Sequence, residues 1–140
     1  MNKRLLIPIA FLLPCILLLS SCREDVIAPD NPAGNINEPV RIKEKFSYSF
    51  YINAYNISTS VSDVSGISST HSTVSVSLDD YTQGTASFNI YDNSNNLVYR
   101  KVFAENGIQI SESLEGSTPD LVWINFNHFT GKLQIKVFVN

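Results

Sequence analysis

The chain has 140 residues and a formal net charge of -3, and this length suits one domain. Its 10 Lys or Arg are scattered and outnumbered by 13 Asp or Glu, which excludes a basic nucleic-acid-binding surface. Both cysteines, Cys15 and Cys22, lie near the N-terminus, so the rest of the chain has no disulfide or cysteine metal site. We expect one acidic domain without a cofactor.

The first 21 residues have the three zones of a secretory signal peptide. Lys3 and Arg4 form a short basic start, residues 5–19 are apolar and uncharged, and small residues follow. The alternative is an uncleaved membrane helix, which needs about 20 apolar residues. Pro8 and Pro14 would also break helical hydrogen bonds inside the run. We therefore expect a signal peptide that is cleaved.

The tetrapeptide Leu19-Ser20-Ser21-Cys22 ends this segment. It resembles the lipobox of bacterial lipoproteins, in which an aliphatic residue, two small residues and a cysteine guide the lipoprotein signal peptidase. The resemblance implies a signal peptide of residues 1–21, cleaved between Ser21 and Cys22. It also implies a diacylglycerol on the Cys22 sulfur, usually followed by acylation of the new amine. Because two or three acyl chains anchor a protein stably, we expect a membrane-anchored lipoprotein.

Residues 22–44 are expected to form a flexible tether after the lipidated cysteine. They contain Pro29, Pro32 and Pro39, several Asn and no periodic apolar pattern, so they cannot bury enough apolar surface to become ordered. Proline keeps such a linker fairly extended. The alternative is that an N-terminal strand begins within this stretch, at residues 40–42.

Arg23-Glu24-Asp25 directly follows Cys22. A basic residue followed by acidic ones resembles the export signals of surface lipoproteins in the Bacteroidetes. The enteric signal for retention in the inner membrane, an Asp directly after the cysteine, is not present. The resemblance implies an outer-membrane location and is compatible with exposure at the cell surface. A charged, solvated linker is the alternative.

From residue 45 onward, apolar residues recur with a period of two, which is typical of strands with one buried face. Four runs alternate in this way, and four shorter runs are rich in β-branched or aromatic residues. The alternating runs are 46–54, 74–78, 86–90 and 133–139, and the shorter runs are 57–64, 97–103, 108–114 and 121–126.

Asn, Asp, Gly and Pro, which favour tight turns, separate these runs. Seven or eight strands with turns about every dozen residues predict an all-β antiparallel sandwich or small barrel over residues 45–140. We favour a sandwich with an immunoglobulin-like arrangement. Residues 87–103 and 129–137 resemble small immunoglobulin-like modules of secreted and surface proteins from the Bacteroidetes. The turns are expected at 79–84, 92–96, 105–107, 116–119 and 128–131.

His71 and His128 are the candidates for acid–base chemistry. His71 lies within residues 57–77, where 12 of 21 residues are Ser or Thr, but no GxSxG, HExxH or paired-carboxylate motif accompanies it. An edge strand and loop with hydroxyls facing water is the favoured interpretation. For His128, between Phe126 and Phe129, an ordinary turn is favoured over an exposed contact residue. We expect no catalytic residue and no enzymatic activity.

Three acidic residues, Asp79, Asp80 and Asp92, could meet at one end of the sandwich and bind calcium through their oxygens. No DxDxDG loop is present, however, and adjacent acidic residues in a turn are normally solvated. We therefore expect no metal site.

Tyr51, Tyr91 and Phe138 lie on strand faces opposite to their apolar neighbours, and Trp123 lies in an apolar run. If these faces are open to solvent, the aromatic side chains form a platform for sugar rings or a protein-binding patch. Core packing is favoured, because large aromatic side chains are mostly buried and the run around Trp123 is typical of a central strand. Tyr51, Tyr91 and Trp123 are the candidate ligand-binding residues.

These features predict a membrane-anchored, non-enzymatic lipoprotein with a binding or structural role at the cell envelope or surface. Its partner would be a protein or a polysaccharide. A carbohydrate-binding accessory lipoprotein of a polysaccharide-uptake system predicts an exposed candidate aromatic that is coplanar with another aromatic. An assembly protein predicts an exposed apolar patch or an open strand edge at residues 74–78 or 133–139. A hydrolase, the least favoured, predicts a histidine within hydrogen-bond reach of a serine and an acid.

Overall fold

The computed structural model describes residues 34–140. The predicted signal peptide, its cleavage site at Ser21 and Cys22, and the tripeptide Arg23-Glu24-Asp25 lie outside the described residues. Residues 34–140 contain no helix of the length and apolar character that crossing a bilayer requires. Their strands are β1 (Val40–Glu44), β2 (Ser47–Val64), β3 (His71–Tyr91), β4 (Leu97–Phe103), β5 (Ile108–Glu115) and β6 (Leu121–Val139).

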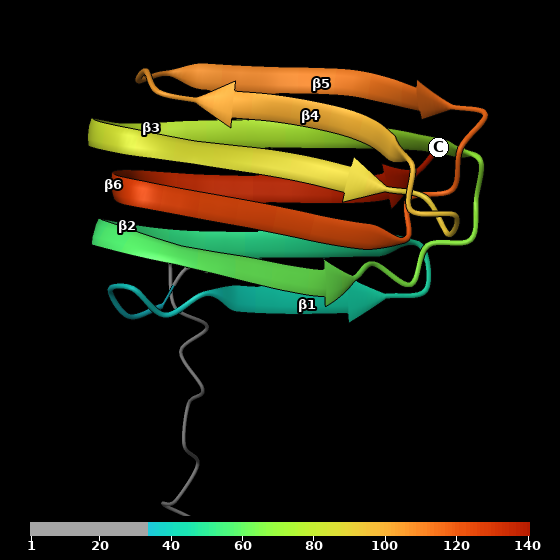
Figure 1. Cartoon of the computed structure of the whole chain (residues 1–140), viewed down its shortest axis with the longest axis horizontal. Helices are drawn as coiled ribbons and strands as arrows, with labels where there is room; N and C mark the ends of the chain where they lie inside the picture. The colour runs from blue at the N-terminus through green and yellow to red at the C-terminus, as the bar shows by residue number, and fades with distance from the viewer. Residues whose placement is uncertain (1–33) are drawn as a thin grey trace, which may run out of the picture.

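The strands form one antiparallel sheet in the order β1-β2-β6-β3-β4, with β5 also paired to β3. The long strands β2, β3 and β6 fold back on themselves, which produces the two layers of a sandwich (Figure 1). The first half-sheet contains β1, β5 and residues 47–54, 71–79 and 131–139 of the long strands. The second half-sheet contains β4 and residues 57–64, 85–91 and 121–127.

Left-handed backbone conformations occur where the three long strands turn back. The φ angles are 47° at Asn56, 80° at Gly84 and 48° at His128, and the strand registers shift at these places. Such irregularities bend a strand and interrupt its ladder of hydrogen bonds. Side-chain oxygens replace part of that ladder. The Asn56 amide donates to Thr130 Oγ1 at 2.8 Å, and the His128 amide donates to Ser58 Oγ at 2.9 Å.

The hydrophobic core fills the space between the half-sheets. It is rich in aromatic rings, and Phe50 of the first half-sheet lies 6.3 Å from Phe126 of the second, measured between ring centroids. Offset aromatic pairs at this separation contribute beyond the area that they bury. The largest fully buried side chains include Tyr48, Phe50, Phe88, Phe103 and Phe129.

An ion pair links the two half-sheets along each side of the sandwich. On one side Asp63 of β2 pairs with Lys43 and, at 3.6 Å, with Arg41 of β1. On the other side Lys101 of β4 pairs with Glu112 of β5 at 3.1 Å. These contacts join segments of the two half-sheets that are not paired with each other, because β1 pairs with residues 47–51 of β2 and not with residues 57–64, and β4 and β5 pair with different parts of β3.

Behind each ion pair lies a buried tyrosine. Burial raises the pKa of Tyr48 well above its usual range, and the nearby Asp63 carboxylate raises it further. Burial likewise raises the pKa of Tyr99, with a further contribution from Glu112. Both phenols therefore stay neutral at any physiological pH, and both sandwich margins combine an outer charge pair with an inner aromatic ring.

The predicted all-β antiparallel fold is confirmed, but the count of seven or eight strands is wrong because residues 34–140 form six, one of them before residue 45. The eight apolar runs lie in strands as expected, yet three pairs of runs belong to the continuous strands β2, β3 and β6. Residues 79–84 and 128–131 accordingly form bends inside strands rather than loops. The turns at 92–96, 105–107 and 116–119 do connect strands.

The first strand begins inside the segment expected to be a tether. The tether was predicted to reach residue 44, but Val40–Glu44 pairs with Ser47–Tyr51 along β2. The alternative of an N-terminal strand at residues 40–42 is therefore confirmed, and the domain begins before residue 45. The sequence pattern gave only a weak signal for this strand, because a run with two apolar residues, Val40 and Ile42, is too short to show a clear period of two.

Gly84 provides a test of how the bends are held. A Cβ atom there would lie 2.3 Å from the His128 carbonyl oxygen, whereas a Cβ at Gly107 (φ 72°) would meet nothing within 4 Å. We expect Gly107→Ala to cost about 1–2 kcal/mol, the price of left-handed backbone. Gly84→Ala should cost roughly 3 kcal/mol or more, since backbone must also move. Urea unfolding of the two variants measures the difference, and equal losses would contradict close contact between the bends.

Candidate functional site

The two histidines have hydroxyl or amide neighbours, and His71 lies opposite Glu115 in the ladder of β3 and β5. His71 Nδ1 lies 3.2 Å from Thr70 Oγ1. His128 Nδ1 lies 3.3 Å from Asn56 Oδ1 at the bends. Within residues 34–140, neither imidazole forms an ion pair with a carboxylate. The triad-like geometry that the hydrolase hypothesis requires does not occur around these two side chains.

The three aspartates considered for calcium are separated. Asp80 lies at the bend of β3 and pairs with Lys132 at 2.7 Å. Asp92 follows the far end of β3, where its carboxylate accepts hydrogen bonds from the Ser94 and Asn96 amides at 2.9 and 2.8 Å. A hydrogen bond from the Asn96 side-chain amide at 3.0 Å, followed by these backbone bonds, lowers the pKa of Asp92. No cluster of metal-ligating side chains occurs in the part of the chain that the structure describes.

The strand edges expected to be open for strand addition are paired. Residues 74–78 lie between β6 and β5, and residues 133–139 lie between β2 and β3. Both stretches are interior because each has a paired strand on either side in the first half-sheet. The Ser/Thr-rich stretch was predicted to form an edge strand, and this holds for residues 57–64 only, at the margin of the second half-sheet.

The candidate aromatic residues lie on two different faces. Tyr51 is half-buried on the outer face of the first half-sheet, opposite Gln134. Tyr91 and Trp123 lie on the outer face of the second half-sheet, where Tyr91 is half-buried and Trp123 is 40% exposed. The prediction that Trp123 belongs to a strand buried on both faces is wrong, because only its neighbours Val122 and Ile124 point into the core.

Tyr91 and Trp123 belong to an apolar surface, which we name the Trp123 face. In the sheet register Leu121 lies between Val64 and Tyr91, and Tyr91 pairs with Leu97. One row of four apolar residues thus crosses all four strands of the second half-sheet. Val64 is 54% exposed and Leu97 is 50% exposed. Trp123 lies in the next row of the same face.

Polar side chains adjoin the indole of Trp123. Its Nε1 donates a hydrogen bond to Asn125 Oδ1 at 3.1 Å, and Ser60 Oγ donates to the same oxygen. Asn89 lies opposite Trp123 on β3, and Arg100 lies opposite Asn89 on β4. The hydrogen bond fixes the orientation of the ring, so the face combines a positioned aromatic plane with amide and guanidinium donors.

The outer face of the first half-sheet has a different character. Ser, Thr, Gln and Lys dominate its rows, which cross from β2 over β6 and β3 to β5. One such row is Tyr51, Gln134, Ser77 and Gln109, and the next is Ser49, Lys136, Ser75 and Ser111. The sandwich therefore has one polar outer face and one face with an apolar row.

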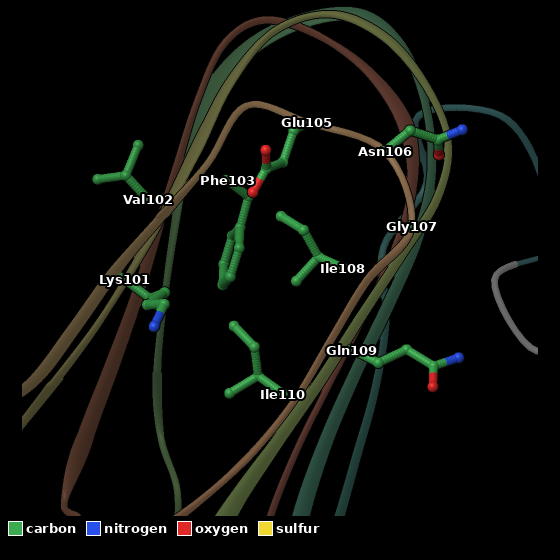
Figure 2. Close-up of a pocket in the computed structure, with 9 residues that line it drawn as sticks. All are labelled: Lys101, Val102, Phe103, Glu105, Asn106, Gly107, Ile108, Gln109 and Ile110. Atoms are coloured by element: carbon green, nitrogen blue, oxygen red, sulfur yellow. The ribbon is translucent and has the colours of Figure 1, made fainter.

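A crevice of about 380 Å³ opens between the edges of β4 and β5. Figure 2 shows Phe103, Ile108 and Ile110 directed into it, with Lys101 along one wall. The crevice exists because β4 and β5 pair with different parts of β3 and diverge from each other.

Sequence reasoning missed both the crevice and the apolar row. The crevice arises because β4 and β5 pair with different parts of β3. The alternation of apolar residues does not indicate which parts of two strands pair. The row combines Val64, Leu97 and Leu121, each of which lies at the end of a strand. The sequence does show that these three apolar residues lie at strand ends. Only the pairing of the strands shows that they form one row.

No family model matches the chain, and no curated protein matches it. Solved structures show distant likenesses. A chain of the disulfide-linked pili of Bacillus endospore appendages is 13% identical, with 73% of this chain and 91% of that chain covered and a TM-score of 0.44.

Two further chains are less similar. A chain of the glycosylation-associated Gap123 complex from Streptococcus agalactiae is 12% identical, with 69% and 38% covered and a TM-score of 0.33. A chain described as BiXyn10A CBM1 is 10% identical, with 74% of both chains covered and a TM-score of 0.32. At such identities these likenesses concern the all-β fold and do not indicate a partner.

The Lys101–Glu112 pair beside the crevice has a measurable signature. The hydrogen bond from Lys101 lowers the pKa of Glu112 below its ordinary value of 4.5. A carboxyl with a lowered pKa stabilises the fold above its unfolded pKa and loses this effect as the pH falls through the folded value. Lys101→Gln should therefore raise the Glu112 pKa and weaken the acid dependence of unfolding. NMR titration measures the pKa, Lys132→Gln is the control, and an unchanged pKa in Lys101→Gln would contradict the pairing.

Proposed function

We propose that this chain is a lipid-anchored, non-enzymatic binding protein of the cell envelope that contacts its partner through the Trp123 face. The observation that carries the binding part of the proposal is the apolar row of Val64, Leu121, Tyr91 and Leu97 beside the exposed Trp123. Contiguous exposed apolar patches on small proteins typically mark interaction sites.

The anchor part of the proposal rests on the sequence of the first 25 residues. The lipobox-like Leu19-Ser20-Ser21-Cys22 supports lipidation at Cys22, and Arg23-Glu24-Asp25 supports transfer to the outer membrane. Residues 22–33 separate the lipidated cysteine from the described domain. At about 3.3–3.6 Å per residue, these 12 residues reach at most about 43 Å, so the domain would stay near the bilayer.

The contrast between the two outer faces supports a specific contact surface. Aromatic and Arg side chains are enriched at the centres of protein interfaces, whereas Ser and Lys are depleted there. The Trp123 face has Trp123, Tyr91 and Arg100, whereas Ser, Gln and Lys predominate on the opposite face around Tyr51. A protein partner in the envelope or at the cell surface is therefore the first candidate ligand.

A polysaccharide is the second candidate, and one observation favours it. The indole of Trp123 is fixed by Asn125, with Asn89 on the neighbouring strand, and sugar rings stack on such aromatic planes while amides bond their hydroxyls. Trp123 is the only Trp in the chain, so binding of a polysaccharide would change the protein fluorescence directly. If the ligand is a polysaccharide, Leu97→Ser should leave the change in Trp123 fluorescence intact. Binding of a protein partner should instead require both Leu97 and Trp123.

Site-specific photo-crosslinking in intact cells tests the proposed face. A photoreactive amino acid replaces Leu97 on the Trp123 face or, as the matched control, the exposed Gln134 on the opposite face. We expect one discrete crosslinked protein from position 97 and none from position 134, because the partner should cover only the apolar row. Adding Trp123→Ser should abolish the product, since the central aromatic residue of an interface typically dominates its binding energy.

Identical crosslinking patterns from positions 97 and 134 would show that contact is random and would contradict the proposed face. A product at position 97 that survives Trp123→Ser would show that the indole has no role. In both cases circular dichroism of the variants confirms that the sheet is intact, since the replaced side chains lie outside the core.

A further inference from the structure

The β1–β2 hairpin forms a corner of the sandwich that combines exposed aromatic and basic side chains. Phe46, at the turn, is 59% exposed, and Lys45 Nζ lies 4.9 Å from the centre of its ring. On the adjacent strand β6, Lys136 Nζ lies 5.7 Å from the centre of the Phe138 ring. We name these residues, together with the 42% exposed Ile42, the hairpin corner.

The hairpin corner is held rigidly by the sheet. The carbonyl oxygen of Phe46 accepts a hydrogen bond from the Val139 amide at 2.9 Å, and Ser47 pairs with Phe138 in the ladder of β2 and β6. Ser47 Oγ also donates to Glu44 across the turn at 3.0 Å. Phe46 is therefore presented to solvent by a fixed backbone, although burying it against the domain would remove apolar surface from water.

Positive charge gathers at this corner of an otherwise acidic domain. Residues 34–140 contain seven Lys or Arg and ten Asp or Glu. Four of those seven bases lie on β1, on the turn that follows it or on β6, which pairs with the other side of β2. They are Arg41, Lys43, Lys45 and Lys136. The carboxylates beside them are Glu44 and Asp63. The corner therefore has an excess of positive charge.

β1 is also the edge of the domain through which the tether enters. It stands at one end of the strand order, opposite β4, and Figure 1 shows it along one margin of the sandwich with β4 and β5 along the other. Asn37, shortly before β1, lies against Asn53 and Tyr55 of β2, so the chain enters β1 at the end away from the turn, and β1 itself leads from there to the hairpin corner. An anchor at Cys22 would keep the whole margin, including the hairpin corner, near the bilayer at a high local concentration. Weak contacts then suffice for docking.

We propose that the hairpin corner docks on anionic lipid headgroups of the membrane that holds the anchor, so that β1 faces the bilayer. This inference rests on the proposed lipid anchor. Phe46 would enter the headgroup region as an interfacial aromatic side chain, while Lys45 and Lys136 would contact lipid phosphates. Their rings and ammonium groups already lie together, so apolar and ionic contacts form in one place.

Docking in this way sets the orientation of the whole domain. With β1 at the bilayer, β4, β5 and the crevice between them point away from the membrane, because they lie at the opposite margin of the sheet. The Trp123 face then stands upright beside the membrane instead of lying against it. A partner can reach Leu97 and Val102 on β4 without moving the domain.

Fluorescence quenching by brominated lipids tests this orientation. The full chain is expressed, processed by the cell, purified from membranes and reconstituted in vesicles that contain brominated phosphatidylglycerol. One reporter is Phe46→Trp with Trp123→Phe, and the matched reporter at the opposite margin is Val102→Trp with Trp123→Phe. Position 102 suits the control because Val102 is 52% exposed, which is close to the exposure of Phe46.

We expect several-fold stronger quenching at position 46 than at position 102. The quenching at position 46 should fall in vesicles of zwitterionic lipid and at about 1 M NaCl, where the Debye length is only about 3 Å. Lys45→Gln with Lys136→Gln should reduce it as well, whereas Arg100→Gln should not. Equal quenching at both positions, or quenching at 46 that ignores lipid charge and salt, would overturn the proposal.

Failure of the anchor itself can be told apart from failure of the docking. The intact mass of the purified protein reports whether Cys22 carries acyl chains. If Cys22 has a free thiol, the anchor proposal is wrong, and the same chain is coupled through that thiol to a maleimide lipid. The two reporters are then compared in the same vesicles, and the comparison decides the docking proposal as before.

Discussion

Three bends at one end of the molecule hold this fold together, because β2, β6 and β3 must all turn back at matching places in the sheet. Gly84 passes so near the His128 carbonyl that no side chain fits there. His128 in turn exchanges contacts with Asn56 and Ser58. Each long strand thus supplies residues to both half-sheets, and a shift in one register would move apolar residues to the wrong face in both layers.

The two-layer arrangement determines which surfaces are free. One ion pair lies at each margin of the sandwich, Asp63 with Lys43 at one and Glu112 with Lys101 at the other. A buried tyrosine lies next to each pair. The outer faces then differ, because Ser, Gln and Lys predominate on one and the other has an apolar row beside Trp123. The proposed partner contact and the proposed membrane contact use different parts of the domain, so the two can operate together.

Much of the fold could be predicted from the sequence, because alternation identified four of the runs that became strands after residue 45, and β-branched and aromatic content identified the other four. Alternation could not tell that the runs on either side of Asp80 or His128 belong to one strand, since Asp, Gly and His at a bend look like a turn. It also missed β1, whose short edge position leaves Val40 and Ile42 only partly covered. Lys43, Lys45 and Lys136 looked scattered until strand pairing brought them together.

Membrane attachment through Cys22 is the central claim, and the distribution of the protein between membrane and soluble fractions tests it most directly. Wild-type chain and Cys22→Ser are compared after cell lysis, with an epitope at the C-terminus of each. The account predicts that the wild type sediments with the outer membrane and that Cys22→Ser is released into the soluble fraction, because only the acyl chains anchor stably. Retention of Cys22→Ser in the membrane fraction after a high-salt wash would contradict it.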